Sequence, residues 1–146
     1  MSLYNAVDIQ AMIRSQVGVA VAPEFVVDSI FDDGAQITLA VGPEMARLGD
    51  TVSGPVLMTA ADAAMYAAII AHVPDGQNAV TSHLNIEFLK RPPLAGLRAR
   101  AIILRVGRRS VACRVELYTA GEQRLVAHVT GAYARMTSAT SGVSPG

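Results

Sequence analysis

The chain has 146 residues, of which 51% are hydrophobic, and its twelve basic and twelve acidic side chains give no net charge. This length fits one domain with a sizeable core, and the composition is that of an ordinary globular protein without a low-complexity tract. The single cysteine, Cys113, excludes an internal disulfide and favours a reducing compartment.

The charges are divided unevenly along the chain. Residues 1–89 carry two basic and ten acidic side chains, whereas residues 90–146 carry ten basic and two acidic ones. A basic half is typical of proteins that bind nucleic acid or an anionic ligand, and also of a surface that pairs with an acidic half. Because aromatic residues do not alternate with the basic ones, we expect no nucleic-acid partner. The first residues lack a basic segment followed by an apolar one, so we expect a cytoplasmic protein.

The first elements in chain order are a short helix and a hairpin. Apolar residues recur at helical spacing from Ala6 until Gly18, which predicts a helix. Residues 25–31 and 36–41 predict two strands, and the sequence Asp-Asp-Gly at 32–34 is a strong turn signal between them.

A long helix follows, opened by Ser53-Gly54-Pro55 and ended near Pro74. Serine is a good N-cap, and proline is tolerated in the first helical turn. The segment is apolar nearly all round, which predicts a helix wrapped by other elements. It is long enough to suggest a membrane span, but it contains Asp62 and is rich in alanine, which is only weakly hydrophobic, so we expect a buried core helix and no membrane partner.

The rest of the chain predicts strands at 80–88, 97–106, 109–118 and 124–136. Their short connections predict an antiparallel meander. Cys113 falls in the inward-facing row of the third strand, so we interpret it as a core residue and not a nucleophile. The expected organisation is one domain over residues 1–136 and a disordered tail over residues 137–146.

Asp62 is the most informative single residue, because it is a carboxylate in an alanine-rich, apolar helix. Burying an ionised carboxyl costs several kcal/mol unless partners or chemistry compensate. Asp62 is therefore either a site residue, or a group on a wet side of the helix or satisfied by backbone donors. The three histidines lack the spacing of metal ligands, so we expect no metal site.

The order of elements resembles the hotdog fold, an α+β fold in which a curved antiparallel sheet wraps a long central helix, here with an N-terminal helix added. More closely, the chain resembles the acyl-CoA thioesterases of the phenylacetate-degradation (PaaI-like) type over residues 24–135. The stretches that carry the resemblance are Ser53-Gly54-Pro55 with Thr59-Ala60-Ala61-Asp62-Ala63-Ala64, Leu84-Asn85-Ile86-Glu87-Phe88-Leu89-Lys90-Arg91-Pro92, Val106-Gly107-Arg108-Arg109, and Val126-Ala127-His128-Val129-Thr130-Gly131.

This resemblance implies roles for three residues. The amide of Gly54 would polarise the thioester carbonyl, Asp62 would act as nucleophile or general base, and Thr81 would assist. Where the family has His-Gly-Gly, this chain has Ser53 before and Pro55 after the first glycine. Pro55 removes one N–H from the helix start, and we expect the amides of Gly54, Val56 and Leu57 to stay free for an anion.

Distance then requires a second chain. Eight helical residues rise about 12 Å, whereas Gly54 and Asp62 must both approach one carbonyl carbon to within about 3–3.5 Å. If both act, they come from different subunits related by a two-fold axis. The chain is therefore expected to form a homo-oligomer, a dimer at least and a tetramer as a further option.

Other candidates follow from the same resemblance, each with an ordinary structural alternative. Met58 and Tyr66 lie one helical turn on either side of Asp62 and would line an acyl tunnel or belong to the core. Asn85 is expected on the same side of its strand as Thr81, where it contacts substrate or makes structural hydrogen bonds. The remaining candidates, which would grip the phosphates of coenzyme A or lie solvated at strand ends, are Lys90, Arg91, Arg108 and Arg109.

The sequence predicts no cofactor beyond the coenzyme A of the substrate. Two alternative functions stay open. One is a non-catalytic acyl-CoA-binding module, favoured by the Ser53 and Pro55 departures; the other is a hydratase or dehydratase, disfavoured because no histidine stands at the helix start.

Overall fold

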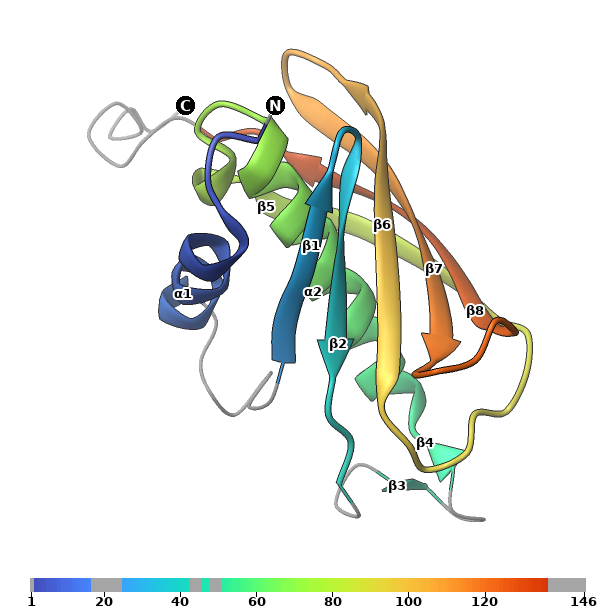
Figure 1. Cartoon of the computed structure of the whole chain (residues 1–146). Helices are drawn as coiled ribbons and strands as arrows, with labels where there is room; N and C mark the ends of the chain where they lie inside the picture. The colour runs from blue at the N-terminus through green and yellow to red at the C-terminus, as the bar shows by residue number, and fades with distance from the viewer. Residues whose placement is uncertain (1, 17–24, 43–45, 48–50, 137–146) are drawn as a thin grey trace.

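A six-stranded antiparallel sheet curves around one long helix in the computed structural model of the chain (Figure 1). The structure describes residues 2–16, 25–42, 46–47 and 51–136. The expected end of the first helix near Gly18 and the expected tail over 137–146 lie outside these residues. The arrangement is the α+β hotdog architecture that the order of elements resembles.

The elements follow one another in the expected order, with small additions. A two-stranded pair precedes the long helix and a short 3₁₀ turn follows it. The bounds are α1 Ala6–Gln16, β1 Phe25–Phe31, β2 Gly34–Leu39, β3 Ala46–Arg47, β4 Thr51–Val52, α2 Gly54–His72, η2 Gly76–Asn78, β5 Val80–Phe88, β6 Leu97–Val106, β7 Ser110–Thr119 and β8 Leu125–Ala134.

The predicted four-strand meander is wrong for β5. The sheet order is β1-β2-β6-β7-β8-β5, so β6, β7 and β8 form a meander while β5 pairs with β8 at the edge of the sheet. The connection over residues 89–96 contains Pro92 and Pro93 and carries the chain across the end of the sheet to β6, which pairs with β2. This crossing leaves β5 as the edge strand next to β8, at the opposite side of the sheet from β1.

The helix α2 begins as the sequence predicts but is capped differently. Ser53 occupies the N-cap with an extended backbone (φ −69°, ψ 153°), yet its side chain makes no capping hydrogen bond. At the other end, the amide of Val73 donates to the carbonyl oxygen of Ile69 at 2.8 Å. By length and composition α2 passes as a membrane span, but 67% of its most apolar window is buried in the protein, as expected of a core helix.

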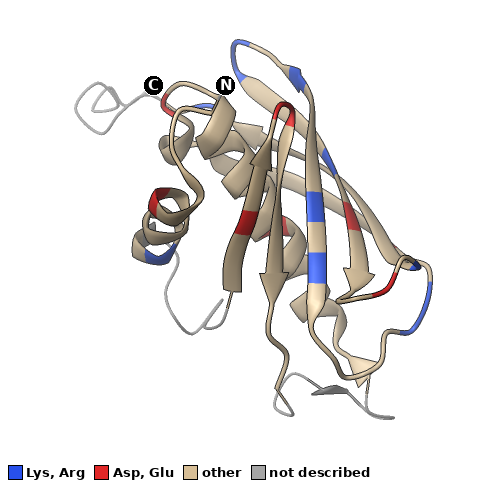
Figure 2. Cartoon of the chain, viewed as in Figure 1, with Lys and Arg blue, Asp and Glu red and all other residues tan. Residues whose placement is uncertain are grey.

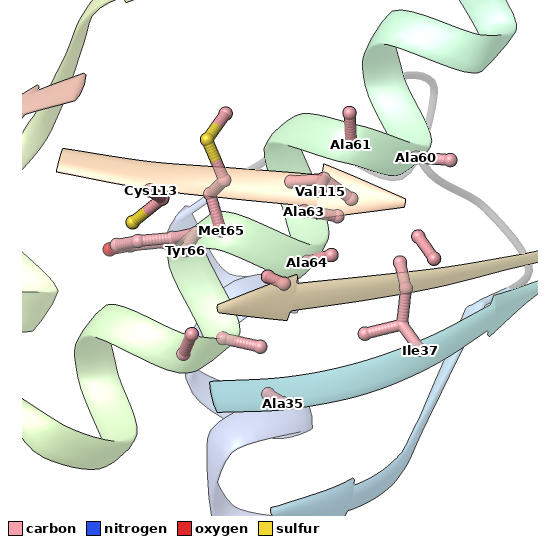
Figure 3. Packing of buried hydrophobic residues seen from close by; sticks show 14 of the residues in the cluster. Ala35, Ile37, Ala60, Ala61, Ala63, Ala64, Met65, Tyr66, Cys113 and Val115 are labelled. Atoms are coloured by element: carbon pink, nitrogen blue, oxygen red, sulfur yellow. The ribbon is translucent and has the colours of Figure 1, made fainter. Parts of the chain in front are cut away.

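Small side chains let the sheet approach α2 closely. The alanines of the helix that are fully buried are Ala60, Ala61, Ala64, Ala67, Ala68 and Ala71. Figure 3 shows Met65 of α2, Ile37 of β2, and Cys113 and Val115 of β7 filling the space between the helix and the strands. Cys113 is 1% exposed, which confirms that it is a core residue, and this burial raises the pKa of its thiol to about 12.

The two edges of the sheet differ. On the β1 side, α1 packs against the sheet and α2 through Ile9 and Ile13, which are both fully buried (Figure 1). On the other side, most of β5 is exposed, including half of the Val80 side chain and 56% of Phe88. Within the residues that the structure describes, β5 pairs with β8 alone and presents an open strand edge. Such an edge is a ready template for pairing with another chain.

Candidate active site

A cavity of about 590 Å³ lies between α2, the start of β5 and the end of α1. Its walls are mostly apolar, and Asp62 is the one acidic residue among those that line it. The lining residues are Ile13, Met58, Thr59, Asp62, Ala63, Tyr66, Gln77, Asn78, Ala79, Val80, Thr81, Leu84 and Tyr133. Met58 and Tyr66 thus lie beside Asp62 in the cavity, on the helix face that their spacing predicts.

Asp62 is partly buried, and two hydroxyl groups hold its side chain. Thr81 of β5 donates to Oδ1 of Asp62 at 2.8 Å, and Tyr133 of β8 donates to the same oxygen at 2.6 Å. The Tyr133 hydroxyl also lies 3.0 Å from the main-chain oxygen of Asp62. Asp62 therefore lines a cavity, and its carboxylate is held by side-chain hydroxyls and not by backbone donors. Of the interpretations open from sequence, this geometry favours a site residue over a group on a wet side of the helix or one satisfied by backbone donors.

A β-bulge in β5 directs Thr81 toward Asp62. The pairing of β5 with β8 shifts between Thr81 and His83, so Ser82 is an extra residue opposite the partner strand. Without the bulge, Thr81 would share a face with Asn85, as predicted from strict alternation. With it, Thr81 lies opposite Tyr133, which faces α2, and Asn85 is exposed and does not line the cavity that contains Asp62. The expectation that Asn85 and Thr81 share a side is wrong, because a bulge reverses the alternation at one point.

Tyr133 is a site residue that the sequence analysis missed. It is 3% exposed, and its ring stacks on Tyr66 with centroids 5.9 Å apart and planes 15° apart. Burial first, and then the neighbouring Asp62 carboxylate, raise the pKa of Tyr133 well above its usual range, so the hydroxyl keeps its proton and donates. The sequence feature that could have identified Tyr133 is a hydroxyl-bearing side chain at an inward-facing position of the last strand, two residues after Gly131.

The start of α2 forms a second, smaller cavity of about 280 Å³. Gly54 lines it together with Lys90 and Arg91, and a Cβ built on Gly54 would lie 3.2 Å from the Phe88 ring. The site expected around the Gly54 amide and the basic pair that follows β5 therefore lie together. They do not lie with Asp62, whose cavity shares no lining residue with this one.

The first turn of α2 offers fewer amides than expected. The N–H groups of Val56 and Leu57 donate to the Ser53 carbonyl oxygen at 3.1 and 3.2 Å, so the prediction that they are free is wrong. Pro55 has no N–H. Gly54 keeps an N–H that donates to no residue in the described ranges. One amide, on the residue that the family resemblance names, is thus available at this helix start.

The remaining candidates are spread over the molecule. Ser53 and Pro55 flank Gly54 but line neither cavity. Arg108 lines a separate hollow near Pro74, and Arg109 lies in the same β6–β7 hairpin. Figure 2 shows this hairpin and the connection after β5 as two separate blue groups, at opposite ends of the sheet. One chain therefore does not gather the four basic candidates.

No group of three metal-ligating side chains occurs among the residues that the structure describes.

Comparison with known proteins agrees with this fold. A family model described as the thioesterase superfamily matches residues 49–126, a range that includes α2 and β5. None of the curated proteins gives a match.

Three solved structures illustrate the likeness of the fold. A protein of Silicibacter sp. TM1040 assigned as a thioesterase shares 27% identity over 92% of this chain and 93% of its own, with a TM-score of 0.81. A mutant of the phenylacetic acid degradation protein PaaI from Thermus thermophilus shares 25% identity over 81% of this chain and 97% of its own, with a TM-score of 0.69. The E. coli PaaI protein shares 23% identity over 88% and 91%, with a TM-score of 0.71.

Proposed function

Because the chain belongs to the thioesterase superfamily and is a thioester hydrolase, we propose that it hydrolyses an acyl-CoA to a free acid and coenzyme A, with Asp62 as the reacting side chain. The observation that carries the proposal is the carboxylate of Asp62 in an apolar cavity, fixed by the hydroxyls of Thr81 and Tyr133. A carboxylate with few solvating waters is a better base and nucleophile than one in bulk water.

The proposed oxyanion donor is the Gly54 amide of the partner subunit. A free N–H at a helix N-terminus suits the negative oxygen of a tetrahedral intermediate, since the helix dipole adds to the hydrogen bond. Within one chain, Gly54 lies about 12 Å along α2 from Asp62, too far for both to act on one carbonyl. Their placement in separate cavities of the same chain supports this distance argument.

Pairing of the open β5 edges of two chains would bring the Asp62 cavity of one chain next to the Gly54 cavity of the other. A two-fold axis at Leu84, the middle of β5, pairs two copies of the strand so that Val80 lies opposite Phe88 of the partner subunit. In each chain, Asp62 lies beside the Val80 end through Thr81, and Gly54 lies beside Phe88. This dimer brings the partner's Gly54 toward Asp62, and it does so twice, once on each side of the axis.

The same axis gathers the basic candidates. Lys90 and Arg91 follow the Phe88 end of β5, whereas Arg108 and Arg109 lie near the Val80 end, because the Arg109 carbonyl accepts from Arg135 where β7 and β8 meet β5. In the proposed dimer, the Phe88 end of one β5 lies beside the Val80 end of the other, so the partner's Lys90 and Arg91 lie beside the β6–β7 hairpin. Arginine forks and lysine both suit phosphate, so this combined group is the proposed contact for the phosphates of coenzyme A.

The reaction that this site supports has two routes. In the first, an oxygen of Asp62 bonds to the thioester carbon, the C–S bond breaks, and the mixed anhydride formed is hydrolysed by water. In the second, Asp62 takes a proton from a water molecule whose oxygen bonds to the same carbon, and the proton ends on the departing thiolate. Both routes consume one thioester and one water and yield one acid and one thiol. In both, the negative carbonyl oxygen faces the partner's Gly54 amide.

The test is the rate of thiol release by Asp62→Asn across short-chain, aromatic and long-chain acyl-CoA substrates. We expect a loss of about 10²–10⁴ in kcat, the usual contribution of a general base or nucleophile. Asp28→Asn is the matched control, because Asp28 also accepts a threonine hydrogen bond, from Thr38, but lies on β1 far from the cavity. Wild-type rates for Asp62→Asn, or binding of acyl-CoA by calorimetry without thiol release by the wild type, would contradict the proposal.

A further inference from the structure

The two oxygens of the Asp62 carboxylate are not equivalent in this structure. Oδ1 accepts both hydrogen bonds, from Thr81 at 2.8 Å and from Tyr133 at 2.6 Å. Oδ2 accepts none from the described part of the chain. A carboxylate oxygen with two donors has its charge stabilised and its lone pairs occupied, so the other oxygen is the more available one.

We infer that Tyr133 is a positioning residue which, with Thr81, fixes Oδ1 of Asp62 so that Oδ2 is the oxygen that reacts. The inference rests on the proposed function, because it assigns a role to the side chains around the same carboxylate. It goes beyond it by naming the reacting atom and a residue that no sequence motif identifies.

Three features of Tyr133 suit this role. Its ring is almost fully buried and stacks on Tyr66, so the hydroxyl has little freedom to move away from Asp62. Its hydroxyl lies near both a side-chain and a main-chain oxygen of Asp62, which ties the carboxylate to the helix that carries it. β8 lies between β7 and β5 in the sheet, so the strand that presents the tyrosine is held on both sides.

The other described residues that line the cavity beside Asp62 are uncharged, so a change at Tyr133 disturbs no second charge there. The described residues that line the cavity from α1, η2 and β5 are uncharged, namely Ile13, Gln77, Asn78, Val80, Thr81 and Leu84. The titratable groups facing Asp62 are Tyr133 of β8 and Tyr66 of its own helix. Tyr66 donates its hydroxyl hydrogen to the Gln77 carbonyl oxygen at 2.6 Å and not to the carboxylate.

Tyr133→Phe tests the inference by removing one oxygen atom and keeping the ring. With one donor lost, Oδ1 keeps only the Thr81 hydrogen bond, so the carboxylate is held less firmly in one orientation. A freer carboxylate also spends less time in the reacting geometry, so kcat should fall about 10–100-fold with little change in KM. Circular dichroism and dimer mass check that the variant folds and assembles.

Tyr66→Phe is the matched control, because it removes the hydroxyl of the stacked partner ring. It should leave the ¹³C signal of the Asp62 carboxyl at its wild-type position, since its hydroxyl donates to Gln77. A folded Tyr133→Phe variant whose Asp62 carboxyl signal equals that of the wild type would overturn the inference, whether or not its kcat falls, because a merely structural tyrosine would behave in that way.

A second readout separates this inference from the proposed function. The ¹³C chemical shift of the Asp62 carboxyl carbon can be measured at one neutral pH on aspartate-labelled protein without any substrate, with Asp62→Asn to assign the signal. This chemical shift should move in Tyr133→Phe, because a hydrogen bond to Oδ1 is lost, and stay constant in Tyr66→Phe. If Asp62→Asn hydrolyses acyl-CoA normally, the proposed function fails while this shift can still appear. If Asp62→Asn is inactive and no shift appears, the inference on Tyr133 alone fails.

Discussion

Two inactive variants should restore activity to each other when they share a dimer, if Asp62 of one subunit acts with Gly54 of the other. The first variant is Asp62→Asn. The second is Gly54→Pro, which removes the N–H of the proposed oxyanion donor. Gly54 is the first residue of α2, where no helical carbonyl accepts its N–H, and proline is tolerated there. Ser53 before it has the extended backbone that normally precedes proline (φ −69°, ψ 153°).

The expected recovery follows from the composition of the dimers. Alone, Asp62→Asn should lose about 10²–10⁴ in rate and Gly54→Pro about 10²–10³. When equal amounts of the two are unfolded and refolded together, about half of the dimers contain one chain of each. Each mixed dimer has one site with both changes and one site with neither. The mixture should therefore reach about a quarter of the wild-type rate, because half of the dimers each contain one intact site out of two.

The assay is thiol release by the refolded mixture, compared with each variant refolded alone. Mixing without unfolding controls for recovery that does not need exchange of chains. Gly54→Ala keeps the N–H and adds a Cβ about 3.2 Å from the exposed Phe88 ring, which has room to move, so it should lose far less activity than Gly54→Pro. A mixture no more active than the sum of its two components would refute the composite site.

Three further predictions concern the dimer, the sheet and the core. Leu84→Asp should give monomers by light scattering and abolish activity, because it places two carboxylates face to face at the proposed two-fold axis. The control Val26→Asp, on the edge strand at the other side of the sheet, should stay dimeric. Gly34→Ala should lower the free energy of unfolding in urea by about 3 kcal/mol, because its Cβ would lie 1.9 Å from the Ala101 carbonyl oxygen, and an unchanged midpoint would contradict this reasoning. The native Cys113 thiol should not react with a thiol reagent at pH 8. Burial raises the pKa of the Cys113 thiol to about 12 in the folded protein, whereas the thiol of the unfolded chain loses its proton at its ordinary pKa of about 8.5. The free energy of unfolding should therefore fall as the pH rises from the ordinary pKa toward 12, and it should fall less in Cys113→Ala.

Local sequence patterns predicted the helices and strands well where a segment has a clear pattern of apolar residues. The strand segments 25–31 and 36–41, with a turn signal at 32–34 between them, predicted the hairpin of β1 and β2, and the apolar segment after Ser53 predicted α2. These patterns depend on neighbours within a few residues, so they survive any tertiary arrangement. The same locality made Asp62 stand out, because a charge in such a helix is unusual whatever surrounds it.

Pairing between distant strands could not be predicted in the same way. Short connections favoured a meander, but the chain after β5 crosses the end of the sheet before β6 begins, and β5 pairs with β8 instead. The β-bulge at Ser82 could not be predicted either, because the sequence pattern of β5 does not show where one extra residue is inserted. Yet that bulge decides that Thr81, and not Asn85, shares the side of the strand that faces Asp62.

The sequence by itself therefore determined the succession of elements, the acid in the central helix and, through the rise of a helix, the need for a second subunit if Gly54 takes part. Only the tertiary structure decided which side chains hold that acid. Tyr133 lies 71 residues from Asp62 in the chain, and their hydrogen bond depends on strand order, register and one bulge. Helical and strand periods are properties of a local segment, whereas a contact of this kind is a property of how the segments are packed.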